Sequence, residues 1–445
     1  MLSLIVVFAV AAVAASLANA AAYELAWNRR RVSPWQPTPE GVARRTALDR
    51  VPVLGWLRLR RDAGVLGRGF WLRPMLVELA FAAAMAALYW WEVWPAKALV
   101  VQQPLASLPA EGYSGLRAFA AHFVLAWLML AASLIDVDEK TIPDEITVRG
   151  TLLALVLMTA MPMAALPNVE ERAAAPAVGV ALRGFKGDLT PGPNGAPVYA
   201  EPTHAVAPGE WPDSLAGGPR NQSSLAIGLG CYVLWCFALS TRVWRTRRGV
   251  LRGLGLLLTR SLRDLRSRPL REMLVVGVLL ISMVWLAGGP AWQGLLTALV
   301  GMIGAGSIVW AVRIVGTAAL GREAMGFGDV TLMMMIGAFL GWQAGLLIFF
   351  LAPFAALLVG VSQVVLRRGD EVPYGPFLCM AAAVLVVQWG VVWPRCEVIF
   401  GLGPVVPIVL VVCLAVLGVL LVLWRWFKVR VLGISEDWDD EPVAA

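Results

Sequence analysis

Apolar stretches long enough to cross a lipid bilayer recur from one end of the chain to the other. A helix needs about 20 residues to cross the roughly 30 Å hydrocarbon layer. Hydrophobic residues make up 59% of the chain and charged residues only 15%, which excludes an ordinary soluble domain. The sequence therefore predicts an all-α polytopic membrane protein with about 11 spans, or 9–11 if short neighbours merge. The expected spans are 2–27, 74–94, 116–135, 149–166, 223–241, 273–288, 292–316, 330–351, 352–366, 376–393 and 404–424.

The first apolar stretch ends in small residues, as a cleaved export signal does. A signal peptide carries its positive charge before the apolar core, whereas Arg29, Arg30 and Arg31 follow the core here. We therefore expect an uncleaved helix whose N-terminus lies outside the cytoplasm.

The distribution of arginine sets the expected topology, because basic residues accumulate in loops that stay cytoplasmic. Residues 28–72 hold ten arginines against three acids, and residues 242–272 hold ten against two. The loop 167–222 is rich in Pro, Gly and Ala and much less basic, so we expect it to be exported and weakly structured. Odd-numbered spans then run inward and even-numbered spans run outward.

These boundaries divide the chain into seven expected parts. They are the first membrane helix (1–27), a basic cytoplasmic loop (28–73), membrane helices (74–166), the exported loop (167–222), further membrane helices with an arginine-rich inner segment (223–291), membrane helices (292–424) and a cytoplasmic tail (425–445).

The net charge of +7 is explained by basic loops beside an anionic inner leaflet, so we expect a lipid bilayer and no nucleic acid as partner. The five cysteines lie in or beside spans and form no disulfide or zinc framework. His122 and His204 have no neighbours typical of a metal site. We therefore expect no metal.

Two acids interrupt the apolar pattern at the ends of spans. Asp136 follows Leu134 and Ile135 at the end of the third span, and Asp329 opens the eighth span within GFGD, residues 326–329. The topology places both at the cytoplasmic face and at similar depth. Two carboxyl groups held close together tend to share one proton, so that one acts as a base toward water and the other as an acid toward a peptide carbonyl. The pair therefore predicts peptide hydrolysis without a metal or a covalent intermediate.

Other acids in the same stretch have a simpler interpretation. We expect Asp138, Glu139, Asp144 and Glu145 to be solvated or to stabilise a helix N-terminus, with Lys140 compensating their charge.

Two further segments are candidates for substrate contact. Gly326 and Gly328 remove side chains on either side of Phe327 and allow another backbone to approach Asp329. The irregular backbone expected at Pro373, Tyr374, Gly375 and Pro376 either pairs with an extended substrate or forms the turn that starts a helix.

These motifs resemble those of the type IV prepilin peptidases, which are GxGD-type membrane aspartyl proteases. IDVDEKTIPD (135–144) resembles the first aspartate motif of the family, GFGD matches the second, and EVPYGPFL (371–378) is similar to a proline-glycine segment before the last helix. The resemblance covers most of residues 1–166 and 292–393. In the N-terminal region, family-like residues are Asn19, Pro52, Trp56 and Glu78.

The resemblance implies that Asp136 and Asp329 are the catalytic pair. It implies a multi-pass protein of the bacterial inner membrane that cleaves the leader of a prepilin or pseudopilin at the cytoplasmic face, typically after glycine. Related enzymes often also methylate the new N-terminus with S-adenosylmethionine.

The chain departs from the family pattern in three places. Many members carry two CxxC pairs in the first cytoplasmic loop that look like a zinc site, but residues 28–72 contain no cysteine. A zinc site is therefore not expected, and both retention and loss of methyl transfer stay open. Thr331 stands where lysine is common, and residues 167–291 have no counterpart.

Two other classes of function also fit paired acids at a membrane edge. An ion-coupled transporter uses them as a relay, although its repeated halves are not evident in this sequence. An inactive scaffold of a pilus or secretion assembly would be consistent with the missing cysteines. The sequence makes no prediction of oligomeric state.

Overall fold

The computed structural model describes residues 2–93, 115–162, 166–171, 198–202, 221–240, 268–321, 323–365, 373–400, 402–403 and 405–430. Most of the expected exported loop with His204, the arginine-rich segment up to residue 267 and the tail from residue 431 lie outside these ranges.

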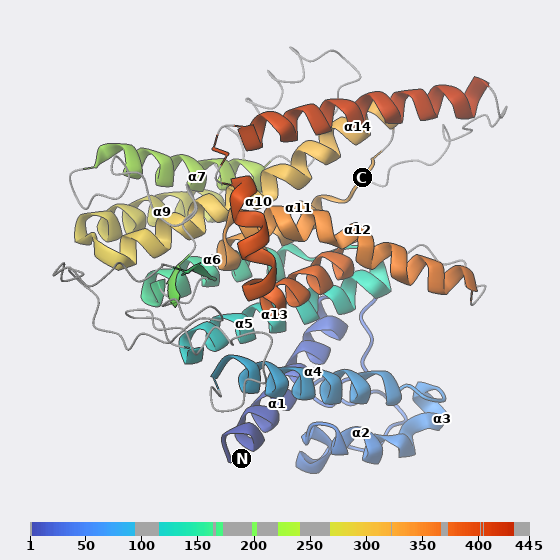
Figure 1. Ribbon diagram of the computed structural model, residues 1–445. Helices are drawn as coiled ribbons and strands as arrows, with labels where there is room; N and C mark the ends of the chain where they lie inside the picture. The colour runs from blue at the N-terminus through green and yellow to red at the C-terminus, as the bar shows by residue number, and fades with distance from the viewer. Residues whose placement is uncertain are drawn as a thin grey trace.

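Long helices dominate the structure (Figure 1). Eight are long and apolar enough to cross a membrane, and two shorter apolar helices accompany them among the described residues. Every expected span falls on helix, although the span 330–351 covers parts of two helices, and the predicted all-α polytopic class is confirmed. Among the described residues, eight helices rather than eleven have the length and composition to cross a membrane. The long helices are α1 (Leu2–Leu25), α4 (Leu72–Val93), α5 (Gly115–Glu139), α6 (Asp144–Ala160), α7 (Gln222–Ser240), α9 (Arg268–Ala287), α10 (Gly289–Leu320), α11 (Phe327–Leu340), α12 (Trp342–Val365), α13 (Gly375–Phe400) and α14 (Val405–Arg430).

One predicted boundary differs from the structure. The sequence placed a break between residues 351 and 352, just before Pro353, but α11 ends at Leu340 and α12 continues through Pro353. The break lies at Gly341, whose φ of 88° is a left-handed conformation that favours glycine. Proline is tolerated inside apolar membrane helices because neighbouring groups satisfy the freed backbone.

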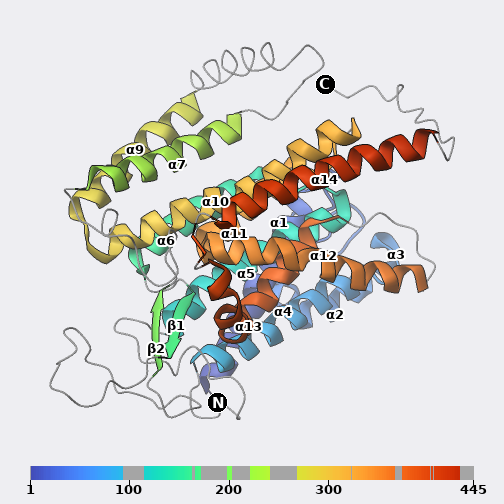
Figure 2. The same ribbon diagram turned by 45° about the horizontal axis from the view of Figure 1, so that its top comes forward.

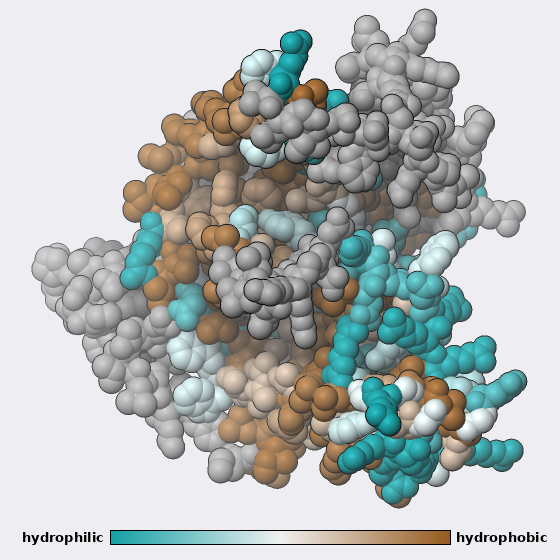
Figure 3. Space-filling model, turned by 90° about the vertical axis from the view of Figure 1, so that its right-hand side faces the viewer, coloured by the Kyte–Doolittle hydropathy of each residue, from teal (hydrophilic) through white to brown (hydrophobic). Residues whose placement is uncertain are grey.

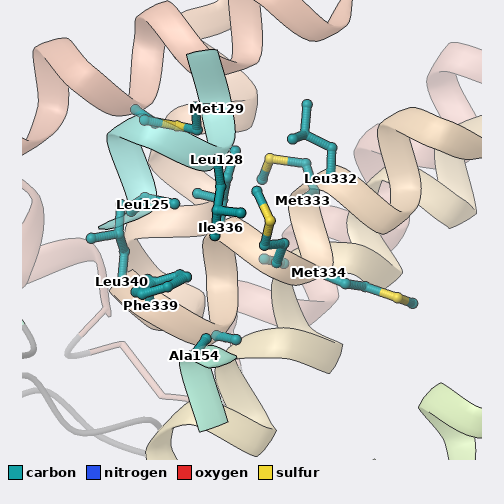
Figure 4. Packing of buried hydrophobic residues seen from close by; sticks show 14 of the residues in the cluster. Leu125, Leu128, Met129, Ala154, Leu332, Met333, Met334, Ile336, Phe339 and Leu340 are labelled. Carbon is teal, nitrogen blue, oxygen red and sulfur yellow. The ribbon is translucent and has the colours of Figure 1, made fainter. Parts of the chain in front are cut away.

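Helix α11 forms the centre of the bundle, and its residues 329–340 are all buried. Figure 4 shows its side chains, among them Met333 and Phe339, packed against residues of α5 and α6. Its approach to α10 is so close that a Cβ at Gly337 would lie 2.3 Å from the Gly301 carbonyl oxygen. A helix this buried holds its first turn, which carries Asp329, in a fixed place.

The basic loop after α1 folds into short helices that pack on α4. These are η1 (Ala47–Arg50), α2 (Leu54–Leu59), η2 (Arg60–Asp62) and α3 (Ala63–Leu66). Figure 3 views the molecule from the end at which α12 and α14 finish in Figure 1. In this view hydrophilic residues gather on the lower right, and hydrophobic residues cover much of the left. This separation is what a bundle with one polar end requires in a bilayer.

The carboxylate of Glu78 joins this loop to the membrane helices. Glu78 is fully buried on α4 and accepts hydrogen bonds from the Val53 backbone N–H at 2.6 Å and from Trp56 Nε1 at 2.9 Å. The side-chain amide of Asn19 on α1 donates to the Pro74 carbonyl at 3.1 Å and lies 3.5 Å from Glu78 Oε1. The family-like residues at 19, 56 and 78 therefore meet in one cluster.

Two short strands lie within the expected exported loop 167–222. Strand β1 (Pro167–Glu171) pairs antiparallel with β2 (Val198–Pro202). Figure 2 shows this hairpin beside the bundle, with α7 and α9 side by side on another flank.

Candidate active site

Four helix ends converge at the candidate site. Helix α5 ends there, three residues after Asp136, while α6, α11 and α13 all begin there. Segments separated by nearly two hundred residues are thus brought to one end of the bundle. The expected placement of Asp136 and Asp329 at similar depth agrees with this geometry.

A cavity of about 780 Å³ opens between these helix ends. Its volume suits a peptide segment better than a single ion. It is lined by Asp136, Lys140, Thr141, Ile142, Asp144, Glu323, Ala324, Met325, Gly326, Phe327, Gly328, Asp329, Pro373 and Tyr374.

Asp136 is 4% exposed and lies against the start of α13. Gly375, whose backbone N–H has no acceptor within α13 because it opens the helix, lies beside the Asp136 carboxylate. A Cβ at residue 375 would lie 2.5 Å from Asp136 Oδ2, so only glycine allows this approach. Asp136 Oδ2 is buried and has no hydrogen-bond partner among the described residues. This oxygen is therefore available to a proton, a water molecule or a substrate.

Asp329 lies in the first turn of α11 and is 8% exposed, with its side chain in the same cavity. Its charge and that of Asp136 are close enough to repel each other. Two carboxylates in this arrangement hold one proton more readily than none. The Thr331 hydroxyl donates to the Gly328 carbonyl at 3.0 Å and so belongs to the turn that carries Asp329.

Tyr374, which carries a phenol, lines the cavity. Burial, with a smaller contribution from the charge of Asp329, raises the pKa of Tyr374 to about 12. The phenol therefore keeps its proton at neutral pH and can donate a hydrogen bond to a bound peptide.

The predicted substrate-contact residues have different positions. Gly326, Phe327, Gly328, Pro373 and Tyr374 line the cavity. Gly375 and Pro376 instead form the first turn of α13. Of the two roles expected for this segment, these two residues therefore have the second, the turn that starts a helix. Space beside Gly328 is limited, because a Cβ there would lie 3.0 Å from that of Ile142.

The four neighbouring acids also have distinct roles. Asp144 and Glu145 lie in the first turn of α6, as expected, although Asp144 also lines the cavity. Asp138 pairs with Arg73 at the start of α4, with Nη1 and Oδ1 2.5 Å apart. Glu139 accepts hydrogen bonds from the backbone N–H groups of residues 27 and 28. These last two contacts join the N-terminal part of the chain to the helix that carries Asp136, and the local sequence gives no signal for them.

The loop between α1 and α4 does not fit a zinc ion. It has no cysteine or histidine, and its two buried acids already have cationic partners. Asp49 pairs with Arg58 and Arg61, and Asp62 pairs with Arg45. Across the described ranges, no group of three or more potential ligands is close enough to hold a metal.

Comparison with known proteins was consistent with this site. Residues 251–361, which include Asp329, match the model of the type IV leader peptidase family. No solved structure matches the chain.

Several curated proteins named prepilin leader peptidase/N-methyltransferase are similar to the chain. The protein of Aeromonas salmonicida (strain A449) is 31% identical over 146 residues, covering 30% of this chain and 48% of the relative. The protein of Stutzerimonas stutzeri is 31% identical over 173 residues, with coverages of 37% and 57%. The protein of Pseudomonas aeruginosa is 30% identical over 168 residues, with coverages of 36% and 55%.

The chain spans about half the length of the curated relatives it matches. The family match includes GFGD, one of the three motifs on which the predicted resemblance rested, and it also covers residues 251–291, for which the sequence predicted no counterpart. The predicted resemblance of this chain to the type IV prepilin peptidases is thereby confirmed.

Proposed function

We propose that the chain is a prepilin leader peptidase that hydrolyses the leader of type IV prepilin or pseudopilin-like substrates. The observation that carries this proposal is the meeting of two buried aspartates from different helices in one cavity. The family match and the names of the relatives support the same reaction.

Asp136 and Asp329 act together as an acid and base pair in this mechanism. The ionised member removes a proton from a water molecule as it attacks the peptide carbonyl, and the protonated member gives its proton to the carbonyl oxygen. Proton transfer of this kind contributes about 10²–10⁴-fold for each positioned group. Burial at a membrane edge keeps bulk water away from both carboxyl groups and so strengthens their action on the bound peptide.

The cavity walls would hold the substrate extended across the pair. The backbone at Gly326 is open to a second chain, since a Cβ there would meet no atom closer than 3.8 Å, and Tyr374 and Phe327 border the same space. Five charged side chains share the wall with apolar residues such as Ile142 and Met325, and this mixture suits the junction between a polar leader and an apolar membrane segment.

We place the site at the cytoplasmic face of a bacterial inner membrane. The support is the arginine-rich loop between α1 and α4, which packs at the start of α4, together with the rule that such loops stay inside. An inverted orientation would put ten arginines of residues 28–72 on the exported side.

The transporter and scaffold alternatives explain fewer of these observations. A relay needs a polar path across the bilayer, but residues 330–340 beyond Asp329 are buried and almost entirely apolar. A scaffold needs neither acid, yet Gly375 leaves space for one of them.

Incubation of the purified full chain in liposomes with a prepilin-like peptide tests the proposal. We expect cleavage, with one new N-terminus identified by mass spectrometry at the junction of the leader and the apolar segment. Parallel reactions with and without S-adenosylmethionine, as co-substrate, report methyl transfer as a 14 Da gain on that product. A substrate that stays intact under all conditions would contradict the proposed function.

A further inference from the structure

The residue Arg313 contacts the active-site wall from outside the cavity. It lies near the C-terminal end of α10, and its side chain is only 14% exposed. Helix α10 has 32 residues and is therefore about 48 Å long. The helix exceeds the roughly 30 Å hydrocarbon thickness, so its last turns, with Arg313, extend to the polar end of the bundle.

A single guanidinium group holds three alternate residues of the segment between α10 and α11. Arg313 Nε donates to the Met325 carbonyl oxygen at 2.9 Å, and Nη2 pairs with Glu323. The Arg313 guanidinium carbon lies 5.6 Å from the ring centroid of Phe327. Contacts to a carbonyl, a carboxylate and an aromatic face together require the planar group of arginine.

All three partners are cavity residues. Glu323, Met325 and Phe327 line the same space as the two aspartates, and Asp329 follows Phe327 by two positions. Other contacts also hold the segment: Met325 and Phe327 pack against the hydrophobic core, and the Ala324 backbone N–H donates a hydrogen bond to Thr317 Oγ1 at 3.3 Å. Arg313 is distinguished by contacting three residues of the segment at once, so it contributes directly to the position of the wall beside Asp329.

We propose that Arg313 is a positioning residue of the active site, holding residues 323–327 so that Asp329 meets Asp136 across the bound peptide. This inference rests on the proposed function for its effect on catalysis. Arg313 acts through the wall and does not touch the reacting atoms. Misplacement of a catalytic group by about 1 Å costs roughly 10²-fold in rate, so loosening the segment should lower kcat.

Two measurements on the full chain in liposomes test the inference. The first compares the steady-state kinetics of Arg313→Gln and Arg313→Lys with the original chain. We expect kcat to fall about 10–100-fold for the Gln variant while KM and the thermal midpoint change little, and to fall less for Lys, which retains the charge. Arg395→Gln is the matched control, since the Arg395 side chain bonds only a carbonyl of its own helix among the contacts identified.

The second measurement does not depend on cleavage. With the native cysteines replaced, Ala324→Cys places a thiol in the cavity wall, and its rate of reaction with a polar maleimide reports how firmly the segment is held. We expect Arg313→Gln to raise this rate at least about 3-fold and Arg395→Gln to leave it unchanged.

The outcomes separate the two proposals. An unchanged kcat and an unchanged labelling rate in Arg313→Gln would overturn the positioning role, as would a parallel loss of kcat, substrate affinity and thermal midpoint. If the original chain cleaves nothing but labelling still increases in the variant, the proposed function fails and the positioning of the segment stands.

Discussion

Gly375 lies directly against the Asp136 carboxylate, so that a Cβ at residue 375 would lie 2.5 Å from Asp136 Oδ2. We therefore expect Gly375→Ala to displace the Asp136 carboxylate and to lower kcat/KM by about 10²-fold or more. Cleavage of a fluorogenic leader peptide measures the effect. Gly230→Ala is the control, because a Cβ there meets open space. Equal activity of the two variants would show that the glycine at 375 has no role beside Asp136.

The separation between α10 and α11 provides a second prediction. Gly301 and Gly337 face each other so closely that a Cβ on either would lie 2.3 Å from the carbonyl oxygen of the other. Gly337→Ala should push α11 away from α10, lower the thermal midpoint and reduce cleavage together, since Asp329 moves with its helix. Differential scanning fluorimetry and the cleavage assay check both effects. A stable variant with full activity would mean that the helices tolerate a wider separation.

The loop 28–72 should fold without a metal ion, and Glu78 should be essential for that fold. In Glu78→Ala the Val53 N–H and Trp56 Nε1 lose their acceptor, and each buried unpaired donor costs about 1–3 kcal/mol. We expect trypsin to cut the loop 28–72 much faster in this variant. Treatment of the original chain with a strong chelator should leave the digestion pattern unchanged, whereas a chelator-induced increase would reveal a metal that the loop residues do not suggest.

The acid stability of the same loop should depend on Asp49. Burial alone would raise its pKa, but hydrogen bonds from Thr46 and Arg58 and the charge of Arg61 lower it from 3.8 to about 2. A depressed pKa in the folded state stabilises that state above the unfolded value, and this stability is lost as pH falls from about 4 toward 2. Pepsin digestion across that range should show increasing cleavage of the loop below pH 4. In Asp49→Asn the loop should already be sensitive at pH 4, and identical profiles would contradict the role of Asp49.

Sequence was a good guide to the helices and to the two aspartates, because both are encoded locally. Apolar length predicted where the long helices lie, although eight of them among the described residues are long and apolar enough to cross a membrane, and GFGD marked Asp329 through its own neighbours. The expected boundary between residues 351 and 352 was wrong because α12 continues through Pro353, as apolar membrane helices allow, and the chain breaks instead at Gly341.

The contacts made by Glu139 and Arg313 could not be predicted in the same way. Glu139 bonds backbone groups more than a hundred residues away, and Arg313 contacts a wall whose position depends on the packing of α10 against α11. Their side chains look like ordinary charged residues at helix ends, so only the three-dimensional arrangement distinguishes them.

The central claim is that Asp136 and Asp329 are both required for cleavage. The most direct test measures cleavage of a prepilin-like substrate by Asp136→Asn and Asp329→Asn in liposomes, with Asp138→Asn as the matched control because its ion pair with Arg73 lies outside the cavity. We predict that each of the first two variants loses cleavage completely while remaining inserted and folded, and that the control keeps most of its activity. Full cleavage by either Asp136→Asn or Asp329→Asn would contradict the two-aspartate mechanism.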